Sequence, residues 1–143
     1  MTPQRISLIT LGVADLGRSR AFYAALGWSP AQETESIVVY QLPGMALALF
    51  ERAALANDQG REAAALGTGA MTLAQNFATE PEVDAAYAAA RAAGATALKA
   101  PRRAEWGGYS GYYADPDGHV WEVAMNPVWP LSEDGTLTLP GRS

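Results

Sequence analysis

Apolar and polar residues follow strand and helix periods along most of the chain, and the order of these segments repeats. Residues 5–13 alternate as in a strand, and residues 16–26 have apolar side chains at helical spacing. Asp15 precedes this helix as a suitable N-cap, and Gly27 follows it. Further strands are predicted at about 28–33, 36–42 and 45–50. The first part of the chain is therefore a predicted βαβββ unit.

The same order is predicted again after residue 70. Residues 70–77 resemble a strand, and Thr79 with Glu82 forms a helix start before a helix at about 81–93. Gly94 ends this helix, and strands follow at about 95–100, 108–114 and 119–125. We therefore predict an α+β protein with one domain over 1–127, modules at about 5–50 and 70–126, a connector at 51–69, and a C-terminal tail at 128–143.

Residues 106–127 predict a hairpin around the turn Asp115-Pro116-Asp117-Gly118. Symmetric closure of this turn would pair Ala114 with His119 and place Gly111 opposite Glu122. One face of the hairpin would then carry Tyr109, Gly111, Tyr113, Val120, Glu122 and Ala124. Because a glycine would leave room beside the carboxylate, we expect this face to line a ligand cleft.

Two stretches resemble a known family. Leu11–Tyr23, followed by Leu26-Gly27-Trp28, resembles the opening of vicinal oxygen chelate proteins, the glyoxalase/bleomycin-resistance/dioxygenase superfamily. Asp115–Val123 resembles its closing motif, so the resemblance extends over about 5–127. It implies two βαβββ modules that form an open, curved, barrel-like sheet with helices outside and the ligand on the concave side.

The resemblance also implies a divalent metal held by His, Gln or Glu side chains. The corresponding positions fall on Leu8, Thr72 and Glu122, of which only Glu122 is a plausible ligand. The single histidine, His119, is expected to be exposed at the turn and to face away from Glu122. We therefore expect no metal and no other cofactor.

Candidate ligand-binding residues are the polar and aromatic side chains near the predicted cleft: Gln75, Asn76, Trp106, Tyr109, Gly111, Tyr113 and Glu122. Three roles are open for Glu122: a general base, an anchor for a cationic ligand, or a hydrogen-bonded structural acid. Tyr113 fits the core and the pocket equally, and Trp28, Tyr112 and Trp121 are expected in the core. Arg102 and Arg103 fit either the mouth of the cleft or a solvated loop.

Composition narrows the class of protein. The chain has 143 residues, a net charge of −5 and no cysteine, which excludes disulfides and thiol catalysis. The sequence has no basic stripe of the kind that binds nucleic acid. No apolar run approaches the ~20 residues of a membrane span. The N-terminus lacks signal-peptide features, so we expect a cytoplasmic protein. The resemblance and the apolar residues of the tail favour a homodimer.

These observations favour one function and leave an alternative. The favoured function is to bind a small organic molecule in an aromatic cleft without metal, for example to sequester a drug or toxic compound. The alternative is a lyase, isomerase or dioxygenase-like enzyme that uses an atypical metal site or Glu122 as a general base.

Overall fold

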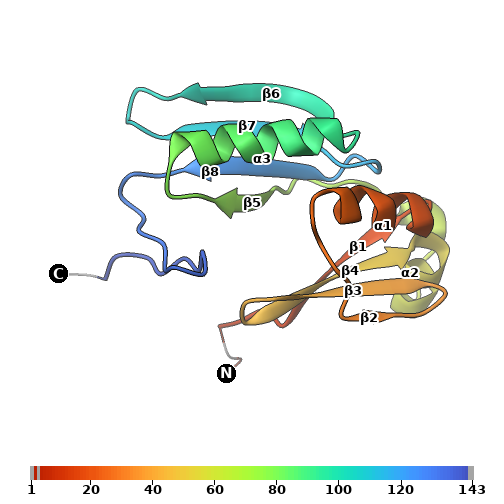
Figure 1. Cartoon of the computed structure of the whole chain (residues 1–143). Coiled ribbons are helices and arrows are strands. Elements are labelled where there is room, and N and C mark those ends of the chain that lie inside the picture. The colour runs from red at the N-terminus through yellow and green to blue at the C-terminus, as the bar shows by residue number, and fades with distance from the viewer. Residues whose placement is uncertain (1, 3, 142–143) are drawn as a thin grey trace. The chain divides into compact units, whose positions relative to one another are not determined.

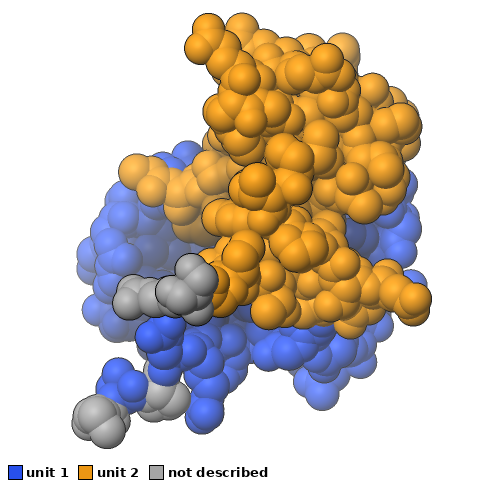
Figure 2. Space-filling view, turned by 90° about the vertical axis from the view of Figure 1, so that its left-hand side faces the viewer, with its two compact units in different colours: residues 1–69 blue, residues 70–143 orange. Residues whose placement is uncertain are grey.

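A computed structural model describes residue 2 and residues 4–141 of the chain. The chain divides into two compact units, unit 1 over residues 1–69 and unit 2 over residues 70–143 (Figure 2). Each unit contains one four-stranded sheet with parallel and antiparallel pairs, which confirms the predicted α+β class and the doubled βαβββ order. The two units are described in turn.

Unit 1 contains β1 (Leu8–Val13), α1 (Leu16–Ala25), β2 (Gln32–Glu33), β3 (Ile37–Leu42), β4 (Met45–Glu51), α2 (Arg52–Gln59) and a 3₁₀ turn (Ala63–Ala65). Its strands lie in the order β1-β4-β3-β2, with β1 parallel to β4. As predicted, the Asp15 carboxylate caps α1 by accepting from the Arg18 N–H at 2.9 Å. Strand β2 is shorter than predicted because the Trp28 N–H still donates to the Tyr23 carbonyl at 3.0 Å, at the end of α1.

One face of the unit 1 sheet packs against α1 and forms a core. Buried side chains alternate along its strands, and this set comprises Leu11, Val13, Val38, Tyr40, Leu47 and Leu49. Phe22 and Tyr23 of α1 are also buried. Part of the other face is covered by α2, since a Cβ on Gly12 would lie 3.2 Å from the Leu55 side chain. The predicted connector therefore contributes packing to the first module.

Unit 2 contains β5 (Leu73–Asn76), α3 (Glu80–Ala92), β6 (Thr96–Arg103), β7 (Tyr109–Ala114) and β8 (Val120–Met125). Its strands lie in the order β5-β8-β7-β6, and α3 crosses one face of this sheet (Figure 1). The predicted helix start is confirmed, because the Thr79 hydroxyl accepts from the Glu82 N–H at 3.3 Å. Gly94, with φ of 105°, ends α3 as expected.

The β7–β8 hairpin has a register one residue away from the predicted one. Asp115 pairs with His119: the Asp115 N–H donates to the His119 carbonyl at 2.9 Å. The Gly118 N–H donates to the Asp115 carbonyl at 2.9 Å, and Gly118 has a φ of 89°. This is a type I turn followed by a left-handed residue, a common three-residue hairpin loop. The predicted pairing of Ala114 with His119 is therefore wrong.

The new register reassigns the two faces of the hairpin. Tyr112 now lies opposite Glu122, and Gly111 lies opposite Val123. Tyr113, Trp121 and Val123 are buried and share the face on which α3 packs. The prediction that Gly111 and Tyr113 share a face with Glu122 is wrong, whereas the placement of Trp121 and Val123 beneath the helix is confirmed. We call the face opposite α3 the open face of unit 2.

The described part of the C-terminal tail, residues 128–141, is mostly exposed. Leu131 and Leu137 form an antiparallel bridge, and the Gly135 N–H closes the turn on the Ser132 carbonyl at 2.8 Å. Val128 and Leu139 remain exposed. Residues 142–143 of the predicted tail lie outside the described part, and the homodimer remains a prediction. Within the described residues, no helix is both long and apolar enough to span a membrane.

Candidate functional site

Two rows of side chains cross the open face of unit 2, one residue from each strand. The first row contains Lys99, Tyr112, Glu122 and Ala74, and the second contains Arg102, Ser110, Ala124 and Asn76. Neighbouring strands lie about 4.8 Å apart, so each row runs about 10 Å from its cation on β6 to β8. The open face therefore places two cations, a phenol, a hydroxyl, an amide and a carboxylate on one small surface.

Glu122 and Tyr112 form a hydrogen-bonded pair at the centre of this surface. Their side-chain hydrogen bond raises the pKa of Tyr112 above the usual value near 10, and burial and the carboxylate charge raise it further. The phenol therefore stays protonated at neutral pH and donates to Glu122. Both side chains are half-buried, so the carboxylate keeps part of its surface for a second hydrogen bond.

The cationic end of the rows borders a cavity of about 340 Å³. Its walls are formed by Lys99, Arg102, Arg103, Ala104, Glu105 and Ser110. Among the described residues, Lys99 and Arg102 take part in no ion pair, whereas Arg103 pairs with Glu80 of α3 at 2.8 Å. Glu105 is one carboxylate in the same wall. The cavity therefore presents two cations that have no ion pair among the described residues, in a chain whose net charge is −5. We call Lys99 and Arg102 the uncommitted cations.

Most of the predicted site residues lie away from this surface. Asn76 and Glu122 are on the open face, but Gln75 lies in register with Val123 on the opposite face. The Tyr109 hydroxyl donates to the Asp84 carboxylate of α3 at 2.6 Å, which raises the pKa of Tyr109. Tyr109 therefore binds the helix, and the aromatic face predicted beside Glu122 is absent from the described hairpin.

Trp106 and Gly111 have packing roles that the sequence did not indicate. The Trp106 side chain is 64% exposed, and its ring lies where a Cβ on Gly108 would be. A Cβ on Gly111 would lie 2.8 Å from the Pro101 nitrogen and 2.9 Å from the Lys99 carbonyl oxygen. Gly111 therefore accommodates the irregular backbone of β6 and leaves no room for a ligand.

Sequence reasoning missed Tyr112, Ser110 and Lys99 as open-face residues. A left-handed Gly118 was the available signal, because it selects the three-residue loop and so moves Tyr112 opposite Glu122. Arg102 was considered only as part of a cleft mouth or a loop, but it lies within β6. Two register shifts in the pairing of β6 with β7 place Lys99 and Arg102 on one face. No local sequence motif predicts these shifts.

The residues present do not fit the metal site that the family resemblance implies. Leu8 is a half-exposed hydrocarbon side chain of β1, Thr72 precedes β5, and Glu122 alone offers a carboxylate. His119, which was expected to be exposed, is half-buried in the turn, where its backbone N–H donates to the Asp115 carboxylate at 2.9 Å. In residues 2 and 4–141, no three His, Cys, Asp or Glu side chains group as metal ligands would.

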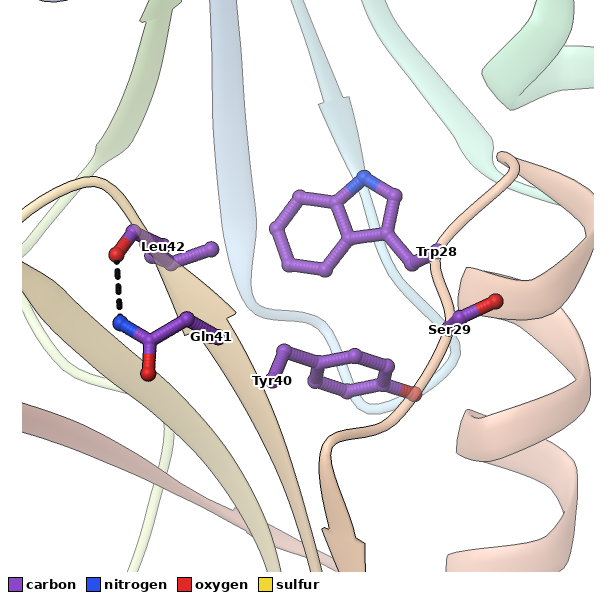
Figure 3. A pocket seen from close by; sticks show the side chains of 5 residues that line it. All are labelled: Trp28, Ser29, Tyr40, Gln41 and Leu42. Carbon is purple, nitrogen blue, oxygen red and sulfur yellow. Dashed lines mark hydrogen bonds between the residues drawn. The ribbon is translucent and has the colours of Figure 1, made fainter.

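Unit 1 contains a separate cavity of about 240 Å³, lined by Trp28, Ser29, Tyr40, Gln41 and Leu42 (Figure 3). The rings of Trp28 and Tyr40 meet edge to face with centroids 5.3 Å apart. Tyr40 is 2% exposed, and its hydroxyl has no hydrogen-bond partner among the described residues. An unpaired buried hydroxyl costs roughly 1–3 kcal/mol, so this group requires an explanation.

Known proteins match this chain over most of its length. The family model described as Glyoxalase/Bleomycin resistance protein/Dioxygenase superfamily matches residues 5–123. The crystal structure of a glyoxalase-related enzyme from Fulvimarina pelagi is 39% identical, with a TM-score of 0.90, over 97% of this chain and 100% of that one.

Two further solved structures are similar at lower identity. A glyoxalase/bleomycin resistance protein/dioxygenase from Nocardioides is 25% identical, with a TM-score of 0.74, over 87% of this chain and 85% of that one. A lactoylglutathione lyase from Agrobacterium tumefaciens is 23% identical, with a TM-score of 0.70, over 92% of this chain and 100% of that one, and supports the fold alone. No curated protein sequence matches the chain.

Proposed function

The chain belongs to the glyoxalase/bleomycin resistance protein/dioxygenase superfamily, and from that premise we propose that it binds a small hydroxylated organic anion on the open face of unit 2 without a metal ion. One observation carries the proposal. Lys99 and Arg102, which have no ion pair among the described residues, border a cavity on β6, next to Tyr112 of β7 and two strands from Glu122 of β8.

The two ends of the surface favour different groups of one ligand. A carboxylate or phosphate is stabilised by charge-assisted hydrogen bonds from Lys99 and Arg102. Glu122 repels a second anion but accepts a hydrogen bond from a hydroxyl, and Asn76 on the same face offers an amide. With about 10 Å between the ends, the surface suits a ligand of a few carbon atoms, such as a hydroxy acid or a small sugar phosphate.

This proposal changes the role expected for Glu122. The sequence left open a base, a cation anchor and a structural acid. The Tyr112 hydrogen bond and the cations across the face support an acceptor that orients a neutral hydroxyl. The aromatic cleft is not part of the proposal, because Tyr109 and Tyr113 lie on the α3 side.

Matched pairs of probes test the charge requirement. We expect lactate and glycerol 2-phosphate to raise the melting temperature of the chelator-treated protein, because a ligand that binds only the folded state stabilises it. Lactamide and glycerol keep the hydroxyl groups but lack the charge, and should leave the melting temperature unchanged. Equal effects of charged and neutral partners, or no effect of either acid at saturating concentration, would reject the proposal.

A further inference from the structure

We infer that the organic anion bound on the open face of unit 2 carries an ammonium group beside two acid groups, and that Glu105 binds this ammonium group. The assignment rests on the function proposed above and narrows its ligand to an amino-substituted hydroxy acid with a second acid group. Glu105 lies with Lys99 and Arg102 in the wall of the cavity of about 340 Å³. The proposed function by itself gives this carboxylate no role.

The charged side chains of this wall do not neutralise one another. Among the described residues Glu105 forms no ion pair, so its carboxylate lies beyond ion-pair distance from the nitrogens of Lys99 and Arg102. Arg103 also lines the cavity, but its charge is balanced by Glu80 of α3 at 2.8 Å. The wall therefore offers a ligand two positive charges and one negative charge around the same space.

Backbone hydrogen bonds fix the turn that carries Glu105, between β6 and β7. The Gly107 N–H donates to the Ala104 carbonyl at 3.0 Å, and Gly107 has a φ of 101°, which glycine adopts without strain. The Ala104 N–H donates to the Gly108 carbonyl at 2.7 Å. Because the turn is closed in this way, the Glu105 carboxylate is placed at the cavity with little backbone left to order when a ligand binds.

A ligand with two acid groups and one ammonium group has the complementary charges. Lys99 and Arg102 stabilise its acid groups through charge-assisted hydrogen bonds, and Glu105 stabilises the ammonium group in the same way. The half-buried Ser110 adds a hydroxyl that accepts a further hydrogen bond from the ammonium group. An acid without the amino group leaves Glu105 facing negative charge, and this repulsion discriminates against it. Glu105 is therefore a specificity-determining residue that selects amino acids over plain hydroxy acids.

Racemic threo-3-hydroxyaspartate and racemic tartrate test this inference, because the first carries an ammonium group where the second carries a hydroxyl and they are otherwise alike. Isothermal titration calorimetry of the chelator-treated protein at neutral pH should show that hydroxyaspartate binds about tenfold more tightly than tartrate. Glu105→Gln should weaken hydroxyaspartate and strengthen tartrate, because it removes an attraction and a repulsion together. A general loss of stability cannot move the two affinities in opposite directions.

Glu133→Gln is the matched control, because it removes an exposed carboxylate of unit 2 that does not line the cavity. This variant should keep the preference for hydroxyaspartate, and a loss equal to that in Glu105→Gln would assign the preference to net charge and overturn the inference. Equal affinities of the native protein for the two acids, tighter binding of tartrate, or a preference that persists in Glu105→Gln would overturn the role of Glu105 alone. Saturable binding of neither acid would reject the proposed function and this inference together.

Discussion

Replacing Gly111 by leucine is expected to unfold unit 2 or to lower its free energy of unfolding by more than about 3 kcal/mol, above the usual cost of overpacking. Gly111→Ala should cost about 1–3 kcal/mol. The physical reason is that any Cβ at this position meets the backbone of β6, with the Pro101 nitrogen 2.8 Å away. Backbone atoms within a paired strand cannot move aside as the end of a flexible side chain can. Chemical denaturation measures the effect.

Gly69→Ala is the control for this prediction. A Cβ on Gly69 would meet no atom within 4 Å, and the backbone there has no positive φ, so the variant should match the native protein. If Gly111→Leu instead folded with native stability and only lost ligand binding, Gly111 would border a cleft as the sequence suggested. That outcome would contradict the β6–β7 packing described above.

Removing both uncommitted cations is expected to abolish most binding of organic anions. Lys99→Met and Arg102→Gln should each weaken glycerol 2-phosphate by about tenfold or more, and the double variant by about 100-fold, because each hydrogen bond to a charged group contributes ~1.5–3 kcal/mol. The substitutions shorten or neutralise exposed side chains of β6, so stability should change little. Isothermal titration calorimetry at constant ionic strength measures the loss.

Arg91→Gln separates the local role of these cations from the net charge of the chain. Arg91 is an exposed residue in the last turn of α3 and does not line the cavity. This variant changes the charge by the same amount as Arg102→Gln and should bind as the native protein does. If it lost affinity equally, general electrostatic attraction would explain the binding and the assignment to the cavity would fail.

The fold was largely predictable because its signals are local. The Asp15 and Thr79 caps, the glycines that end α1 and α3, and the alternation along the strands each act within a few residues. The family resemblance reached the same architecture from two motifs, and the family comparison confirms it. Strand β2 was overestimated because the Trp28 N–H completes the end of α1, which apolar pattern alone does not reveal.

The candidate site was less predictable because it depends on register. A difference of one residue in the length of the loop after Asp115 decides whether Gly111 or Tyr112 lies opposite Glu122. A register shift of one residue also moves every side chain of β7 to the other face relative to β8. Lys99 and Arg102 reach the same face only through irregular pairing in β6. The Tyr40 cavity combines residues of the segment after α1 with β3, and their proximity is set by tertiary packing.

Backbone NMR of chelator-treated protein during titration with glycerol 2-phosphate tests the central claim most directly. We predict saturable shifts of the amide signals of Lys99, Arg102, Ser110, Tyr112 and Glu122, while the signals of α2 in unit 1 stay unchanged. Binding that appeared only after a divalent metal was restored, shifts confined to residues outside the open face, or no saturable shift would contradict metal-independent binding of an organic anion at this surface.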